Sequence, residues 1–283
     1  MTVGAVIFAH NNKTIDYTKL AVFAAKRIKQ HLDIPVSLII DNRGWLLHAY
    51  PDHPFDKVID SEVESMPSQT KTFFDGSLSR EKLEWKNFSR SQIYNLTPYE
   101  TTLVIDSDYV INSSILKSAF DIDCDLQLYH NTLDLALNRD PTAFKRINQY
   151  SIPFYWATVF VFKKNPIMEC FFNLIEYIKS NWFYFKTLYS IEAPAYRNDI
   201  AFSIAIHIMN GKTNGEFALE LPGKMIFAAD KDILVSADAN KMQFLVEKKD
   251  YLGEYTMVKT TGLDVHVMNK FSLSRYIDGG YGV

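Results

Sequence analysis

The chain has 283 residues, of which 47% are hydrophobic and 14% aromatic, and its formal net charge at pH 7 is −3. This composition excludes a disordered polar chain and predicts a packed protein of one large α/β domain or two small ones. The slightly acidic balance gives no overall reason to bind nucleic acid or an anionic membrane surface. Cys124 and Cys170 lack C-x-x-C spacing and a nearby histidine, which predicts neither a zinc site nor a disulfide framework and is typical of a reducing compartment.

Two apolar stretches of the chain have some features of targeting segments. The N-terminal residues 1–12 lack a basic leader, so we expect no secretory signal there. The aromatic-rich stretch from Cys170 to Tyr189 is interrupted by charged residues and falls short of the ~20 apolar residues that a membrane span requires. We therefore expect a cytoplasmic protein without a membrane span.

The first forty residues predict a strand, a helix and a second strand. Val3–Ala9 is a continuous apolar run, typical of a strand buried on both faces. The stretch from Asp16 to His31 has helical periodicity, with Asp16 as the cap and with a buried stripe of Leu20, Phe23, Ala24 and Ile28. Pro35–Ile40 predicts the second strand. Such a βαβ unit implies a right-handed crossover and a parallel sheet.

The middle of the chain is less regular. Residues 43–82 are polar, and only Lys57 to Ile59 predicts a short strand. A helix is predicted from Arg80 to Asn95, with Arg90 on it, from the apolar positions Leu83, Phe88 and Ile93.

A third buried strand, Thr101–Ile105, runs directly into Asp106-Ser107-Asp108. In open α/β sheets this carboxyl edge is where ligands bind. Further strands are predicted at Asp125 to Tyr129 and Ala157 to Phe162, and further helices at Asn165 to Asn181 and Asp199 to Asn210. No repeat or low-complexity linker divides the chain, which favours a single domain.

The strongest chemical signal is the pair Asp106 and Asp108. Two carboxylates at the exit of a rigid strand can share a hard divalent cation that also binds a diphosphate. Asp-x-Asp is common by chance, and overlapping copies occur at Asp121, Asp123 and Asp125. Those copies follow a predicted helix end, where solvated turn carboxylates are expected, whereas Asp106 follows a buried strand.

Three further residues could complete such a site, each with a structural alternative. His266 could supply a neutral imidazole to the same ion, although a lone histidine in an apolar setting is usually structural. Lys270 could offer a positive charge to phosphate. Arg90 could bind phosphate oxygens in a bidentate fashion or be an exposed helix arginine. Asp199, at the start of an apolar helix, is most economically an N-cap.

Several common enzyme motifs are missing. The sequence contains no Walker loop, no G-x-G-x-x-G, no G-x-S-x-G elbow and no H-E-x-x-H. The usual nucleotide-hydrolase, dehydrogenase, esterase and zincin interpretations therefore lack their main signals.

The arrangement resembles the A-type-fold glycosyltransferases that use nucleotide sugars, whose hallmark is a D-x-D motif at a strand end, here Asp106-Ser107-Asp108. It is similar in particular to the family that includes glycogenin and bacterial lipopolysaccharide galactosyltransferases. Between Val3 and about Lys270, six residues match that family's order: Arg90, Asp106, Asp108, Asp199, His266 and Lys270. The family's Asn-Ala-Gly strand is Trp156-Ala157-Thr158 here, and its Asp-Gln-Asp signature is reduced to Asn198-Asp199. Acceptor positioning and the retaining or inverting outcome therefore stay open.

The resemblance implies one Rossmann-like α/β domain with a mostly parallel central sheet over residues 1–283. Its nucleotide-binding half would span about 1–112 and its acceptor-facing half about 113–270. The tail, residues 271–283, would either close over the donor or be a frayed end, with the frayed end favoured.

The resemblance also implies roles for individual residues. Donor binding would fall to Ala9, His10, Asn11, Asp41, Arg90, Ser107 and Lys270. Mn²⁺ or Mg²⁺ would be held by Asp106, Asp108 and His266. Asp199, with Asn198 beside it, would lie nearest the reacting sugar as general base or stabiliser. Trp156 and Thr158 would face the acceptor, with core packing slightly favoured for Trp156.

The predicted function is a metal-dependent hexosyl- or pentosyltransferase that moves a sugar from a nucleotide sugar, in the first place a UDP-sugar, to an acceptor hydroxyl. The acceptor could be a glycan, a protein, a small molecule or a hydroxymethylated DNA base, the last only with a basic cleft. One rival is a sugar-phosphate nucleotidyltransferase, whose Gly-rich basic loop is absent from His10 to Lys13. The other is a non-catalytic nucleotide- or glycan-binding module of the same fold.

Overall fold

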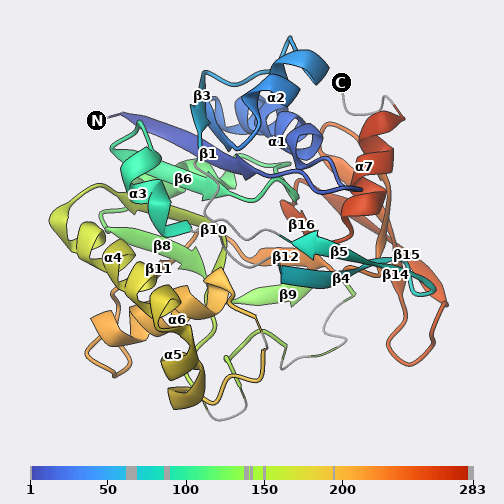
Figure 1. Cartoon of the computed structure of the whole chain (residues 1–283). Coiled ribbons are helices and arrows are strands. Elements are labelled where there is room, and N and C mark those ends of the chain that lie inside the picture. Colours follow the sequence, from blue (N-terminus) through green and yellow to red (C-terminus); the bar gives the residue numbers. More distant parts are fainter. Residues whose placement is uncertain are drawn as a thin grey trace.

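The structure is a computed structural model that describes residues 2–61, 69–85, 90–136, 140, 143–148, 151–193 and 195–279 (Figure 1). Its centre is a seven-stranded sheet made of β1 (Val3–Ala9), β2 (Val36–Ile40), β3 (Lys57–Asp60), β6 (Thr101–Ile105), β8 (Leu126–Tyr129), β10 (Trp156–Lys163) and β11 (Leu219–Glu220). The strand order is β11-β8-β10-β6-β1-β2-β3. Only β10 runs antiparallel to its neighbours in this sheet. The predicted α/β class with a mostly parallel central sheet is confirmed.

Three smaller sheets adjoin the central one. The first has the order β7-β16-β12-β9 and consists of β7 (Tyr109–Val110), β9 (Thr132–Asp134), β12 (Met225–Ala228) and β16 (Val265–Val267). The second is an antiparallel meander of β13 (Ile233–Ala237), β14 (Lys241–Glu247) and β15 (Tyr255–Thr261). The third is a hairpin of β4 (Gln69–Asp75) and β5 (Ser79–Trp85).

The helices lie on both sides of the central sheet (Figure 1). They are α1 (Tyr17–Leu32), α2 (Arg43–Ala49), α3 (Ile93–Leu96), α4 (Pro166–Ser180), α5 (Trp182–Leu188), α6 (Asn198–Met209) and α7 (Lys270–Asp278). Short 3₁₀ segments span Arg90–Gln92 and Ile115–Asp121. Among the described residues, none of these helices has the length and hydrophobicity needed to cross a membrane.

The first βαβ unit forms as the sequence predicts. Asp16 caps α1, because its carboxylate accepts the Lys19 N–H at 3.0 Å, and α1 ends at Asp33 in the left-handed region (φ 55°). The predicted stripe on α1 is buried. β1 pairs with β2 on one side and with β6 on the other, both in parallel. The carboxyl ends of β1 and β6 therefore lie next to each other.

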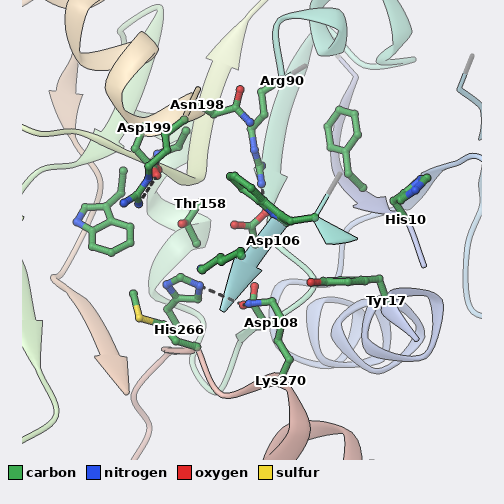
Figure 2. Close-up of a pocket in the computed structure, with 18 of the residues that line it drawn as sticks. His10, Tyr17, Arg90, Asp106, Asp108, Thr158, Asn198, Asp199, His266 and Lys270 are labelled. Carbon is green, nitrogen blue, oxygen red and sulfur yellow. Dashed lines mark hydrogen bonds and ion pairs between the residues drawn. The ribbon is translucent and has the colours of Figure 1, made fainter. Parts of the chain in front are cut away.

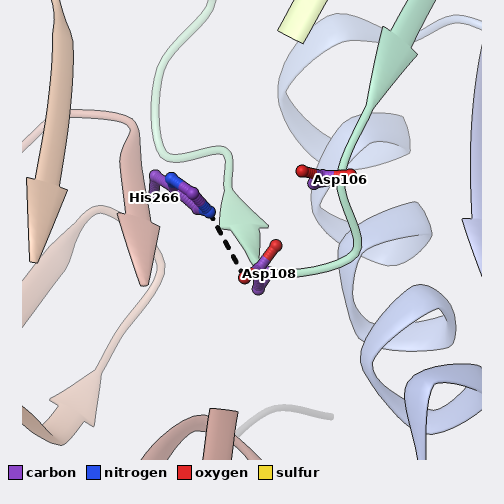
Figure 3. Close-up of side chains that lie close together, drawn as sticks. All are labelled: Asp106, Asp108 and His266. Atoms are coloured by element: carbon purple, nitrogen blue, oxygen red, sulfur yellow. Dashed lines mark hydrogen bonds and ion pairs between the residues drawn. The ribbon is translucent and has the colours of Figure 1, made fainter. Parts of the chain in front are cut away.

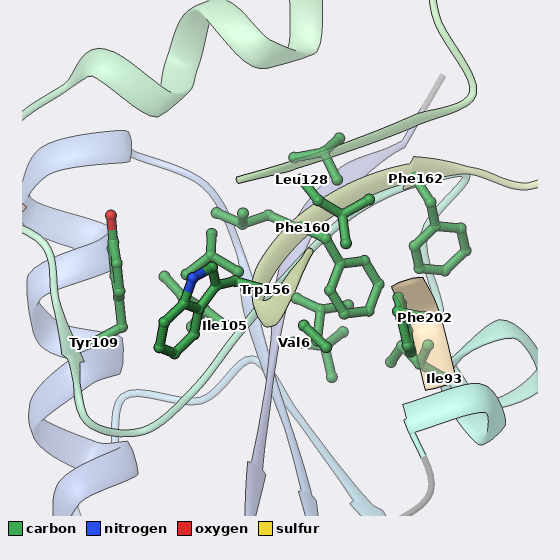
Figure 4. Close-up of a cluster of buried hydrophobic side chains, with 14 of the residues drawn as sticks. Val6, Ile93, Ile105, Tyr109, Leu128, Trp156, Phe160, Phe162 and Phe202 are labelled. Carbon is green, nitrogen blue, oxygen red and sulfur yellow. The ribbon is translucent and has the colours of Figure 1, made fainter. Parts of the chain in front are cut away.

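Aromatic side chains fill the core where α6 packs on β10 and α4 packs on α6, and Figure 4 shows Phe160, Phe162 and Phe202 of this cluster. Phe160 of β10 lies 5.1 Å, between ring centroids, from Phe202 of α6. Phe162 packs edge-on against Phe172 of α4 at 4.9 Å. Burial of such rings is the main stabilising contribution here. It also fixes the start of α6, which lines the cleft.

One predicted element is wrong. The helix expected from Arg80 to Asn95 is strand β5 up to Trp85, and only Ile93–Leu96 is α-helical, while residues 86–89 lie outside the described residues. Gly76, at φ 74°, provides the turn between β4 and β5, and alternate residues such as Phe73 and Leu83 face the body of the protein. Leu83 and Ile93 thus belong to different elements.

Two other segments are more regular than expected. Residues 43–49 form α2, which Asn42 caps through the Trp45 N–H at 2.9 Å. Most of the segment 271–283 belongs to α7, which Asn269 caps through the Ser272 N–H at 3.0 Å, while 280–283 lie outside the described residues. The described part of that segment is therefore mostly helical, and its closure over a donor stays a prediction.

Replacing Gly4 with alanine is expected to lower the free energy of unfolding by about 1–3 kcal/mol. A Cβ at Gly4 would overlap the ring of Tyr99, whose hydroxyl is held at 2.8 Å from Ser37 Oγ. Denaturant unfolding measures the change. Gly44→Ala is the matched control, because the added methyl group has space in α2 and should leave stability unchanged or raise it by up to about 1 kcal/mol. Equal stabilities of the two variants would contradict the packing argument.

Candidate functional site

A cleft of about 440 Å³ opens where β1 and β6 end (Figure 2). Of the residues predicted for the site, the cleft is lined by His10, Arg90, Asp106, Ser107, Asp108, Trp156, Thr158, Asn198, Asp199, His266 and Lys270. Ala9, Asn11 and Asp41 do not line it. The fold therefore brings distant parts of the chain into one cleft: His10 and Lys270, for example, are 260 positions apart in the sequence.

Strand pairing brings His266 to the Asp106-x-Asp108 turn. Asp106 directly follows β6, and β7 begins one residue after Asp108. β16 pairs antiparallel with β7, so that His266 lies opposite Tyr109. The Val267 N–H also donates to the Asp108 carbonyl at 2.9 Å. A residue 158 positions away is thereby fixed beside Asp108.

The three side chains form a group that can hold a metal ion (Figure 3). One ligand atom from each of Asp106, Asp108 and His266 lies within 4.8 Å of the others. His266 Nε2 is 3.3 Å from Asp108 Oδ2, and its buried Nδ1 has no hydrogen-bond partner among the described residues. Two carboxylates and one imidazole suit a divalent cation such as Mn²⁺. The residues present therefore fit the predicted metal.

Each carboxylate of this group also has a cationic partner. Lys270 Nζ is 2.5 Å from Asp108 Oδ2, and Arg90 forms an ion pair with Asp106. Burial by itself would raise the pKa of Asp108, but Lys270 and His266 outweigh it and hold that pKa well below its usual range. Conversely, Asp108 raises the pKa of Lys270 against the effect of burial. Asp108 and Lys270 are both charged at neutral pH.

Arg90 is a buried arginine, not the exposed helix residue that was the alternative. Burial lowers its pKa to about 10, although Asp199 and Asp108 act in the opposite direction, so the guanidinium stays charged at neutral pH. Its Nη1 is buried without a hydrogen-bond partner among the described residues. A buried cation with an unused donor is suited to an anionic ligand.

Asp199 links α6 to β10. Its Oδ1 accepts the Ala157 N–H at 2.9 Å, and Arg197 Nη2 lies 3.0 Å from its Oδ2. The predicted N-cap role is wrong, because α6 starts one residue earlier, at Asn198, with Arg197 in the cap position and no side-chain cap bond. The Asp199 carboxylate is instead held at the cleft wall by one backbone donor and one guanidinium.

Three residues predicted to bind the donor do not line the cleft. The Asp41 carboxylate contacts Nδ1 of His10, which does line the cleft. The side-chain oxygen Oδ1 of Asn11 accepts the Thr18 N–H at 2.9 Å and so helps to fix the first turn of α1. Ala9 is buried in β1.

Trp156 is part of the wall and not an open stacking surface. The residue is 2% exposed, and its ring lies among those of Phe144, Phe154, Phe227 and His266. The edge-on contact with His266, at 5.8 Å between centroids, helps to orient the imidazole. The core-packing alternative therefore describes the ring better.

Several lining residues had no predicted role. Tyr17, at the start of α1, points its hydroxyl toward Lys270 and Asp108, and burial raises its pKa to about 12 (Figure 2). Lys71 and Trp85 come from the β4–β5 hairpin, and Arg197 and Asp230 complete the charged lining. The alternation of apolar residues around Gly76 is the signal that would have revealed the hairpin.

Comparison with known proteins finds similarity in structure only. No family model matches the chain, and no curated protein matches it. A solved structure of an active-site mutant of LgtC is 14% identical, with a TM-score of 0.47 over 76% of this chain and 72% of that chain. The galactosyltransferase LgtC in complex with donor and acceptor sugar analogues is 15% identical, with a TM-score of 0.46 over the same shares. The glycosyltransferase GlyE of Streptococcus pneumoniae TIGR4 is 16% identical, with a TM-score of 0.40 over 78% of this chain and 45% of that chain. Likenesses of this size assign no activity.

Proposed function

We propose that this chain is a metal-dependent glycosyltransferase that moves a sugar from a nucleotide sugar to an acceptor hydroxyl. The observation that supports it most is the group of Asp106, Asp108 and His266 at the end of β6, with Arg90 and Lys270 in contact with its two carboxylates. A divalent cation bound there would neutralise the developing charge of a nucleoside diphosphate leaving group. Mn²⁺ is the first ion to test, and a UDP-sugar the first donor.

The charges of the cleft agree with such a ligand. Its described lining carries Lys71, Arg90, Arg197 and Lys270 against Asp106, Asp108, Asp199 and Asp230. This set is balanced, so by itself it offers no net attraction to an anion. One divalent cation would leave two positive charges in excess, which matches a diphosphate that links a nucleoside to a sugar. This balance supports the proposed metal dependence.

The chain's own residues then have distinct tasks. Arg90 and Lys270 contact Asp106 and Asp108, and once those carboxylates hold the metal the two cations would stabilise the charge of the departing diphosphate. Asp199 would face the reacting sugar, held in place by the Ala157 N–H and Arg197. In an inverting reaction it would accept the acceptor's proton, and in a retaining one it would stabilise the sugar.

The acceptor is best sought among neutral hydroxyl compounds. A DNA acceptor would require a cleft with excess basic residues, whereas the described lining is balanced in charge. We therefore place saccharide, protein and small-molecule hydroxyls before a hydroxymethylated base.

The direct test is release of nucleotide from UDP-, GDP- and CDP-sugars with and without Mn²⁺. Metal-dependent turnover of one donor class would support the proposal and identify the donor. Nucleotide binding without turnover of any donor, even with a broad set of acceptors, would favour a non-catalytic binding module instead.

Mn²⁺ and UDP are expected to bind cooperatively, each raising the affinity of the other by at least about tenfold. In the metal-free cleft, carboxylates occupy Arg90 and Lys270, and the lining carries no net charge to attract a diphosphate. Calorimetric titration of UDP at zero and saturating Mn²⁺, and the reverse titration, measures the coupling. Equal UDP affinities in the two conditions would show that the phosphates do not share the site of the metal.

A further inference from the structure

The β4–β5 hairpin brings a lysine that the D-x-D pattern does not include into the cleft. Lys71 of β4 and Trp85 of β5 line it together with Thr70. Phe73 and Leu83, on the same face of the hairpin as Lys71, are buried against the body of the protein. Lys71 therefore lies on the face of the hairpin that turns toward the cleft, where its side chain is open to solvent.

Contacts from separate elements hold this hairpin in place. Near the turn, Asp75 pairs with Arg275 of α7 at 2.5 and 2.8 Å, and the Ser77 N–H donates to the Tyr255 hydroxyl at 2.8 Å. At the other end, Asn12 donates to the Glu84 carbonyl at 3.1 Å. The position of Lys71 is thus set by the scaffold on both sides.

Lys71 differs from the other cations of the cleft. Arg90, Arg197 and Lys270 each pair with a carboxylate. Among the described residues Lys71 has no such ion pair, and its ammonium group lies 5.5 Å from the Phe73 ring and 5.9 Å from the Trp85 ring. Its charge is therefore available to a ligand.

The surroundings of Lys71 favour an incoming anion. Charged groups reach it from four elements: Lys270 of α7, Arg197 before α6, Asp230 between β12 and β13, and Asp108 after β6. Desolvation in the cleft, followed by Lys270 and Arg197, lowers the pKa of Lys71 to about 8, although the two carboxylates act against this. An anion placed between these cations would relieve their repulsion.

We propose that Lys71 is a phosphate-binding residue of this cleft, whose ammonium group contacts the diphosphate of the bound nucleotide. The proposal rests on the proposed function, because that function supplies the anion. Lys71 would approach the diphosphate from the hairpin, while Lys270 approaches it from α7. A charge-assisted hydrogen bond of this kind changes affinity by about ten- to a hundredfold.

The test is calorimetric binding of UDP and of inorganic pyrophosphate in the presence of Mn²⁺. Lys71→Met should weaken both ligands by about ten- to a hundredfold, and Lys71→Arg should restore most of the affinity. Lys82→Met is the matched control, because Lys82 is exposed like Lys71 but lies on the opposite face of the same hairpin and does not line the cleft, so this variant should leave both affinities within about twofold. Thermal unfolding of each variant verifies that the hairpin remains packed.

The pH dependence gives a second readout. Below about pH 8 Lys71 is already protonated before UDP binds, so its titration should not change the UDP affinity. Above about pH 8 Lys71 must take up a proton when UDP binds, and the UDP affinity should fall by up to about tenfold per pH unit. Lys71→Arg should remove this decline, since arginine stays charged.

The possible failures are distinguishable. If wild type binds UDP with Mn²⁺ but Lys71→Met binds it equally well, the assignment of Lys71 is overturned and the proposed function stands. If wild type binds neither UDP nor pyrophosphate at any Mn²⁺ concentration, both fail together. If Lys82→Met loses as much UDP affinity as Lys71→Met, the loss comes from a less stable hairpin, and the assignment of Lys71 is also overturned.

Discussion

Replacing Asp108 with asparagine is expected to lower kcat by at least about a thousandfold, or roughly 4 kcal/mol. Asp108 is the most enclosed member of the metal group, since it is 3% exposed and contacts both His266 and Lys270. Loss of its negative charge would remove one metal ligand and the partner of Lys270. Nucleotide release from the accepted donor measures turnover, and calorimetry measures Mn²⁺ binding, which should weaken by about a hundredfold or more.

The control for Asp108→Asn must separate chemistry from folding. A buried lysine left without its counter-charge can destabilise the protein by about 3–5 kcal/mol. The double variant Asp108→Asn, Lys270→Met removes both charges and should recover stability without recovering Mn²⁺ binding. Asp123→Asn, in the exposed copy of the motif, should leave both kcat and Mn²⁺ affinity unchanged. Full Mn²⁺ affinity in a folded Asp108→Asn protein would refute the metal group.

The second large effect is expected at Asp199. Asp199→Asn should lower kcat by about a hundred- to a thousandfold while the affinities for Mn²⁺ and UDP stay within about threefold. Asparagine keeps an oxygen for the Ala157 N–H but loses the negative charge that faces Arg197 and the reacting sugar. Steady-state kinetics and calorimetry on the same protein separate the two quantities.

Ser203→Ala provides the comparison for Asp199. Ser203 donates to the Asp199 carbonyl at 2.7 Å and accepts the Tyr155 N–H at 2.8 Å, so it fixes the same turn without offering a group to the sugar. We expect a modest loss of stability and little change in kcat. If kcat falls equally in both variants, the role of Asp199 is structural; if UDP affinity falls as much as kcat in Asp199→Asn, that residue belongs to donor binding.

The sequence was informative wherever burial has a regular period. β1, α1, β2 and β6 were predicted nearly to the residue, because continuous apolar runs and a 3.6-residue stripe report burial directly. The edge of the sheet followed from the same strands, which is why Asp106 and Asp108 could be singled out among several copies of the motif.

The features that the sequence does not predict depend on contacts between distant segments. Leu83 and Ile93 fit one helical face by spacing, yet they lie in a strand and in a separate helix, since the pairing of β5 with β4 decides the local structure. Similarly, spacing could not show that Arg197 and not Asp199 occupies the cap position of α6. Lys71 was missed because its role arises from docking of the hairpin against α7 and β15, which no local pattern encodes.

The pairing of β7 with β16 has a consequence for how the protein reaches its native state. Because His266 and Asp108 are separated by 158 positions, their meeting requires closure of a very long loop, which has an entropic cost. A ligand that binds only after this closure stabilises the whole fold by mass action. Uptake of Mn²⁺ during refolding would accordingly report when the segment around His266 joins the turn that carries Asp108.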